Sequence, residues 1–145
     1  MKEEIMKKTL WILAAIGALL LAVAALRADE GAEKEAKEAA GAWLRLVDAG
    51  EYAESWKKAA SLFQKQVTAS QWKTAVENAR GPLGKVVSRR LRRAEYRKTL
   101  PGAPDGDYVV IQYDTSFEKK NSGIETVTPM KDGDGIWRVS GYYIK

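Results

Sequence analysis

The stretch GPLGKVVSRRLRRAEYRKTLPGAPDGDYVVIQYDTSF, residues 81–117, decides the fold. It opens on Gly81-Pro82-Leu83-Gly84, a cluster that breaks helices and strands. From Val109 to Phe117 apolar and polar residues alternate, which is the period of a strand with one buried face. Because residues 101–106 (PGAPDG) have turn chemistry, the stretch predicts a hairpin of two strands, 86–98 and 107–118.

The flanking sequence extends this hairpin into an α+β domain. Downstream, turns at Asn121-Ser-Gly123 and Asp132-Gly-Asp-Gly135 separate two further expected strands, 124–131 and 136–144. Upstream, apolar stripes at helical spacing predict three helices: one over 32–48, one along 52–63 and one capped by Ser70 and ended by Gly81. Helices followed by a meander predict about three helices packed on one face of a curved, four-stranded antiparallel sheet.

The first 28 residues differ from the rest of the chain. Lysines at 2, 7 and 8 precede an uncharged run from Leu10 to Ala25, which is short for a membrane span. The pattern is typical of a secretory signal peptide cleaved after Ala28, with residues 29–35 as a flexible lead-in and 36–145 as the domain. An uncleaved anchor in the inner membrane is the alternative. Met6 would give a cleaner signal start than Met1.

Composition excludes several chemistries. The chain has no histidine and no cysteine, so it has no histidine base, thiol nucleophile, disulfide or Cys/His metal site. The net charge is +5, and residues 1–28 hold four basic and two acidic residues, so the remainder carries +5 − 2 = +3. This charge is ordinary for a small soluble domain and argues against nucleic acid as a partner.

The basic run from Arg89 to Lys98 is the most unusual feature. Pairing across the 99–106 loop sets Tyr96 opposite Val109, and regular alternation then predicts an inner-face group of Arg90, Arg92, Tyr113 and Thr115. The same alternation turns Arg89, Arg93, Arg97 and Asp114 outward. These arginines are interpreted either as a solvated face or as a site for an anionic ligand or partner, since guanidinium grips carboxylate or phosphate. Attraction to acidic lipid or envelope polymer is a third reading.

Two further features are open to a functional and a structural reading. Aromatic residues fall on the apolar stripes of the expected helices and strands, which predicts that they fill the core, with a hydrophobic ligand pocket as the alternative; they are Trp43, Tyr52, Trp56, Phe63, Trp72 and Trp137. Glu125 is the one carboxylate that an enzyme of this fold would use, but its strand alternates ambiguously, so its face is undecided. Asp132-Gly-Asp-Gly135 lacks the length and final Glu of an EF-hand loop and predicts a tight turn.

Several stretches carry a resemblance to a known family. They are AWLRLVDAG (42–50), YAESW (52–56), PLGKVVSR (82–89), LPGAPDGDYVVIQYDTSF (100–117), ETVTPM (125–130) and WRVSGYYI (137–144). Together they resemble the bacterial family called domain of unknown function 4019 over residues 36–145. The resemblance implies a small exported protein with a cone fold similar to nuclear transport factor 2. It implies no catalytic residue or cofactor, and cone folds of that superfamily serve both enzymes and binding modules.

We therefore expect a non-enzymatic binding module of the bacterial envelope, periplasmic or secreted. No catalytic residue, metal site or cofactor is expected, and the ligand-binding candidates are Arg90, Arg92, Tyr113 and Thr115. The expected partner is a small anionic ligand or an envelope protein, with a homodimer through the outer sheet face as a further hypothesis. The alternatives are an enzyme using the cone pocket and a purely structural envelope component.

Overall fold

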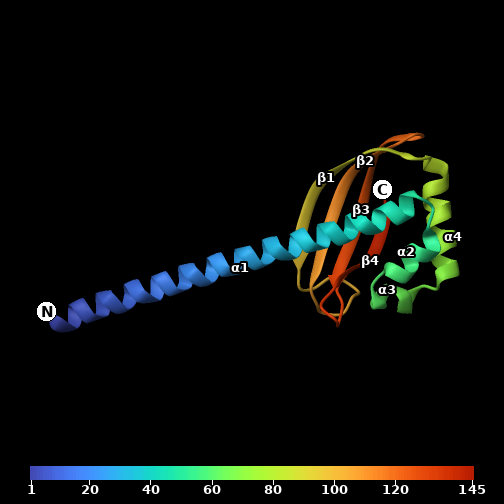
Figure 1. Ribbon diagram of the computed structural model, residues 1–145. Coiled ribbons are helices and arrows are strands. Elements are labelled where there is room, and N and C mark those ends of the chain that lie inside the picture. The colour runs from blue at the N-terminus through green and yellow to red at the C-terminus, as the bar shows by residue number, and fades with distance from the viewer. The chain divides into compact units, whose positions relative to one another are not determined.

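The structure, a computed structural model, describes residues 1–145, which divide into two compact units, Met1–Ala32 and Glu33–Lys145. We call the first the N-terminal segment and the second the domain. Helix α1, Lys2–Asp48, contributes residues to both (Figure 1). Lead-in residues 29–35, expected to fray, are helical, because this stretch of Ala, Glu and Lys contains no proline and only one glycine to interrupt the helix.

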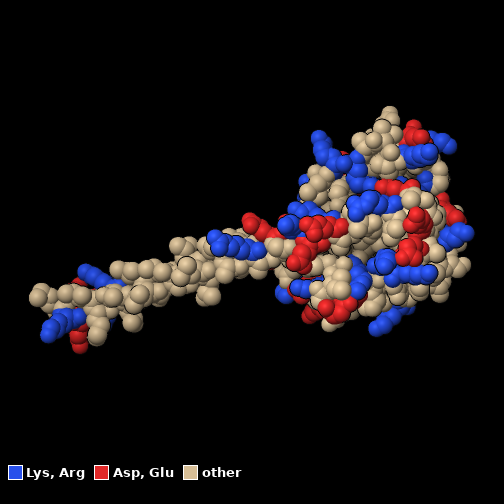
Figure 2. Space-filling model, in the orientation of Figure 1, with Lys and Arg blue, Asp and Glu red and all other residues tan.

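The N-terminal segment is helical and exposed along its whole length. Residues 9–26 contain no charged side chain, and Figure 2 shows an uncharged stretch between charged groups. By length and composition α1 is the one helix of the chain able to cross a membrane, a property that a signal sequence at this position shares. The segment therefore fits either a signal peptide or a membrane anchor.

The domain combines the C-terminal part of α1 with three short helices, a 3-10 turn and four strands. The helical elements are α2 (Tyr52–Lys58), α3 (Ser61–Gln66), α4 (Ala69–Arg80) and η1 (Gly81–Leu83). The strands are β1 (Val86–Arg97), β2 (Tyr108–Phe117), β3 (Lys120–Lys131) and β4 (Trp137–Ile144). They form one antiparallel sheet in the order β1-β2-β3-β4, which confirms the α+β class and the meander (Figure 1).

The helices depart from the sequence prediction in two places. The stripe along 52–63 is broken between α2 and α3, because buried Ala59 and Ala60 are extended and the Ala60 N–H donates to the Val139 carbonyl at 2.8 Å. The cap of α4 is Thr68 and not Ser70. Thr68 and Gln71 exchange side-chain and backbone hydrogen bonds as a capping box.

The register corrects the predicted faces of β1. Pairing is regular from Arg97 to Arg93, as expected, but Leu91 pairs with Tyr113 and Arg93 with Gln112, which leaves Arg92 as an extra residue. This β-bulge reverses the alternation of the strand beyond it. The prediction that Arg90 and Arg92 face the helices is therefore wrong, and so is the prediction that Arg89 faces outward: Arg89 lies opposite buried Thr115, and Arg90 lies opposite Asp114.

The core lies between the helices and the inner face of the sheet. Trp43, Trp72 and Tyr142 pack with ring centroids 5.4–6.2 Å apart, and Phe63 meets Trp72 edge-on at 5.2 Å. Strands β2, β3 and β4 supply buried residues to the same layer: Val109, Ile111, Phe117, Val127, Trp137 and Val139. The predicted core role of the tryptophans is confirmed for Trp43, Trp72 and Trp137, whereas Tyr52 and Trp56 are half-buried.

Candidate functional site

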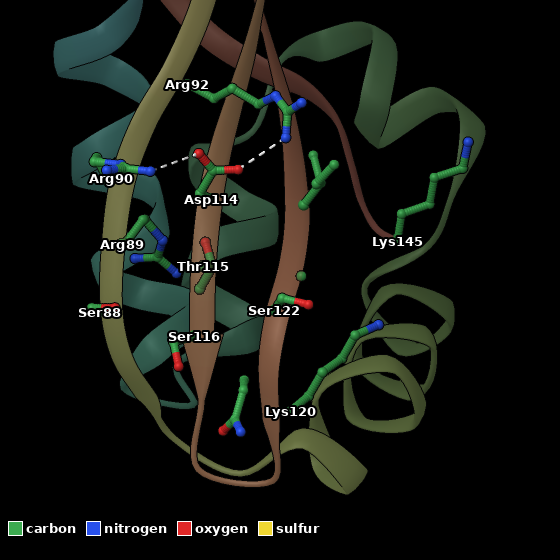
Figure 3. Close-up of a pocket in the computed structure, with 13 residues that line it drawn as sticks. Ser88, Arg89, Arg90, Arg92, Asp114, Thr115, Ser116, Lys120, Ser122 and Lys145 are labelled. Atoms are coloured by element: carbon green, nitrogen blue, oxygen red, sulfur yellow. Dashed lines mark hydrogen bonds and ion pairs between the residues drawn. The ribbon is translucent and has the colours of Figure 1, made fainter.

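An open hollow of about 690 Å³ lies at one end of the β1-β2-β3 sheet, on the face opposite the helices (Figure 3). We call it the outer hollow. Its lining residues are Ser88, Arg89, Arg90, Arg92, Asp114, Thr115, Ser116, Lys120, Asn121, Ser122, Gly123, Ile124 and Lys145. None of these is aromatic, and Ile124 is the one large apolar residue among them.

Two arginines flank one carboxylate in this hollow, and we call Arg90 and Arg92 the arginine pair. Arg90 Nη2 lies 3.4 Å from one oxygen of Asp114, and Arg92 Nη1 lies 3.0 Å from the other (Figure 3). The guanidinium side chains are 83% and 51% exposed, so most of their N–H groups face solvent. Asp114 thus restrains two guanidinium groups, each of which keeps further N–H donors for other partners.

The bulge explains how the arginine pair forms. In a regular strand with Tyr96 opposite Val109, residues 90 and 92 would share the inner face, whereas Asp114 would lie on the outer face. The extra residue at Arg92 turns Arg90 to the outer face, opposite Asp114, and the Arg92 side chain also reaches this carboxylate. One carboxylate thereby holds two arginines that are two residues apart.

Lysines mark two other corners of the outer hollow. Lys120 pairs with Phe117 at the start of β3, three residues along β2 from Asp114, and Lys145 lies beside Ile124 through paired backbone hydrogen bonds. Figure 3 places the lysine side chains on either side of Ser122, away from the arginine pair. With Arg89 turned inward, the hollow holds four basic side chains against Asp114, a balance of 4 − 1 = +3.

The inner face carries a second set of charges, which we call the inner polar network. It takes one residue from each of six elements: Asp48 (α1), Arg80 (α4), Arg89 (β1), Thr115 (β2), Glu125 (β3) and Tyr142 (β4). Glu125 is fully buried and accepts hydrogen bonds from Arg89 (2.8 Å), Thr115 (2.6 Å) and Tyr142 (2.5 Å).

Asp48 closes the inner polar network on the helix side. It accepts from Arg89 at 2.7 Å and from Arg80 at 2.9 Å, while Arg80 also lies 3.8 Å from Glu125. Arg80 is nearly buried, its Nε has no hydrogen-bond partner, and its guanidinium lies 5.2 Å above the Phe117 ring. Two arginines and two carboxylates therefore balance one another inside the domain.

The electrostatics of the inner polar network follow from this pairing. Burial opposes ionisation of Asp48, but hydrogen bonds and charge from Arg89 and Arg80 outweigh it and hold its pKa below the ordinary value. Burial also opposes the charge on Arg89, yet its bonds to Asp48 and Glu125 raise its pKa. For Tyr142, burial and then the charge of Glu125 raise the pKa of the phenol. These shifts favour an ionised Asp48, a charged Arg89 and a neutral Tyr142.

The four predicted ligand-binding residues are divided between these two places. Arg90 and Arg92 line the outer hollow. Thr115 also borders it but is buried, with its hydroxyl turned to Glu125, and Tyr113 is half-buried opposite Glu125 and outside the hollow. Burial raises the pKa of the Tyr113 phenol. The structure therefore does not bring the four together on one face.

The inner polar network itself was missed at the level of sequence. Asp48, Arg80 and Tyr142 carried no motif, because each is one polar residue among several on its element and the three lie far apart in the sequence. One signal was present nonetheless. A buried Glu125 would demand a cation, and the basic run on the first strand offered one. The ambiguity at Glu125 is resolved in favour of the set Glu125-Val127-Pro129, which faces the helices.

The Asp132-Gly-Asp-Gly135 sequence forms the predicted hairpin turn. Arg138 grips Asp134 through two hydrogen bonds of 2.8 Å and reaches Asp132 at 3.1 Å, while Ser61 of α3 also donates to Asp132. The Arg138 bond and the Ile136 backbone N–H lower the pKa of Asp134 to about 2. These carboxylates are thus committed to binding the turn to β4 and α3.

Comparison with known families places the chain. Residues 39–142 match the model of the family described as "Protein of unknown function (DUF4019)", and the chain belongs to this family. The match covers the domain from the second half of α1 to β4, as the quoted sequence stretches predicted. No curated protein matches the chain.

Proposed function

For this DUF4019 protein, we propose a non-enzymatic binding module of the bacterial envelope that holds an anionic ligand in the outer hollow. The observation that carries the proposal is the arginine pair, braced by Asp114 and exposed to solvent. The apolar helix at the N-terminus supports envelope placement, as a cleaved signal that leaves the domain periplasmic or secreted or as an anchor in the inner membrane. The sheet with helices on one face supports a cone similar to nuclear transport factor 2.

The arginine pair supports anion binding on chemical grounds. Guanidinium presents a planar fork of donors that matches carboxylate or phosphate oxygens, often with two hydrogen bonds at once. Asp114 restrains both side chains, so less rotamer entropy is lost when a ligand binds. Without such a ligand, two exposed arginines on one face repel a second copy of the same face, which disfavours a homodimer in which the two pairs meet.

The inner face supports binding over catalysis. A general acid or base must reach a substrate, but Glu125 is fully buried and three donors from the chain already occupy its oxygens. Arg89 also donates to Asp48, and Arg80 donates both to Asp48 and to the Tyr142 hydroxyl, so the network is closed. The enzyme alternative would require this network to open.

The test is a calorimetric titration of the full chain, kept soluble in a nonionic detergent, with tripolyphosphate at low ionic strength. We expect binding that weakens about tenfold or more in the double variant Arg90→Gln/Arg92→Gln, since charge-assisted hydrogen bonds are worth about 1.5–3 kcal/mol each. Salt should weaken binding in the wild type, as expected for exposed charges.

The matched control is Arg93→Gln/Arg97→Gln. It removes the same charge from the same strand, and its side chains are 54% and 55% exposed but do not line the outer hollow. It should bind within about twofold of wild type. Equal loss in both double variants would show attraction to net charge alone, and absence of binding in the wild type would refute the proposed function.

A further inference from the structure

The basic side chains of the outer hollow are spread over three corners. From Asp114 to Phe117, the partner of Lys120, is three residues, or about 10 Å along β2. From Asp114 across β3 to Lys145 is two inter-strand spacings, again about 10 Å. The cations are therefore distributed along the hollow, about 10 Å of backbone apart, and are not gathered at one point.

Several polar side chains lie between these corners. Hydroxyl and amide side chains lie among the cations, namely Ser88, Ser116, Asn121 and Ser122. No aromatic ring is present to stack a nucleobase, which disfavours single-stranded nucleic acid. Ile124 is the one large apolar side chain in the lining. A ligand rich in hydroxyl groups and carrying several separated anionic groups fits this lining.

From these observations we infer that the outer hollow binds an acidic polysaccharide, with the arginine pair holding one carboxylate and Lys120 or Lys145 holding another further along the chain. The inference rests on the proposed function, because it names the ligand class of the same site. Asp114 acts as a positioning residue, since it contacts both guanidinium groups and itself repels the ligand.

The experiment compares galacturonate as the monomer, the dimer and longer oligomers, with tripolyphosphate as the compact anion and neutral dextran as the uncharged polymer. The full chain is used in nonionic detergent. We expect affinity to rise with oligomer length and to level off once the oligomer reaches a lysine corner, about a hundredfold above the monomer, because the second contact is made within one complex. Dextran should not bind.

Two double variants test the lysine contact and the arginine contact separately. Lys120→Gln/Lys145→Gln should remove most of the length dependence and leave tripolyphosphate binding within about threefold of wild type. Arg90→Gln/Arg92→Gln should weaken both ligands. The distant double variant Arg93→Gln/Arg97→Gln is again the control and should change neither.

The outcomes distinguish the inference from the proposed function. Tripolyphosphate binding that depends on the arginine pair, together with galacturonate affinity that does not grow with length, would overturn the polysaccharide and leave the anion site. Binding of dextran as tightly as of oligogalacturonate would overturn it too. If no anion binds, or if the arginine pair is irrelevant to both ligands, the proposed function falls and the inference falls with it.

Discussion

Arg89 and Arg90 are neighbours in the chain but lie on opposite faces of one sheet, in opposite situations. Arg89 is bound by Asp48 and Glu125 and closes a network that joins six elements. Arg90 is 83% exposed and shares one carboxylate with Arg92. The comparison shows that residue type does not decide the role of a charge. The role of an arginine depends on how many hydrogen-bond partners the chain itself supplies. An arginine with unused donors is able to bind a ligand.

The largest expected difference between the two faces is in stability. Arg89→Ala leaves Glu125 buried with its main cation removed, so we expect a loss of about 3–5 kcal/mol in the free energy of unfolding. Arg90→Ala removes an exposed ion pair and should change it by no more than about 0.5 kcal/mol. Urea unfolding followed by tryptophan fluorescence measures both. Equal losses of unfolding free energy in the two variants would contradict the distinction between the two faces.

The pH dependence of stability sharpens the comparison on the inner face. The folded pKa of Asp48 is lowered by Arg89 and Arg80, so its contribution is complete above the unfolded value of about 4 and is lost as pH falls through the lowered folded value. Asp48→Asn should cost about 1–3 kcal/mol at pH 7 and progressively less below pH 4. Urea midpoints of both proteins across this range test it; a constant difference down to the lowest pH would contradict the assignment.

The smallest expected effect concerns Asp114 on the outer face. Asp114→Asn should change the free energy of unfolding by less than about 1 kcal/mol, because its partners are exposed. Loss of the brace should nevertheless alter tripolyphosphate binding, with a less favourable entropy as two freed guanidinium side chains become ordered. Calorimetry reports this term directly. An unchanged binding entropy would show that Asp114 does not position the arginine pair.

Much of the fold was predictable from local pattern. The breaker cluster at 81–84, the loop at 101–106 and the alternation along β2 predicted the first two strands, and the turn residues further along predicted the other two, although residues 121–123 lie within β3 and not in a turn. The break between α2 and α3 was not predictable in this way. It depends on a backbone hydrogen bond from Ala60 to Val139, far along the chain.

The candidate site was half predictable, for a physical reason that lies in one residue. The basic run predicted the strand and suggested the anionic ligand that we propose, but a run of arginines has no apolar alternation that reports a bulge. The extra residue at Arg92 exchanged the faces of Arg89 and Arg90 and placed the arginine pair outside. The same shift places Arg89 on the inner face, where it supplies the cation that buried Glu125 requires.

The most direct test is nuclear magnetic resonance of the arginine Nε–H groups in the full chain, labelled with nitrogen-15 and titrated with tripolyphosphate in nonionic detergent. We predict that the signals of Arg90 and Arg92 move with a common saturation curve, while those of Arg89 and Arg80 stay in place. The claim under test is that the inner face of the sheet stabilises the fold and the outer face binds the ligand. It would be contradicted if the Arg89 signal moved together with those of the arginine pair, or if the signals of the pair did not move.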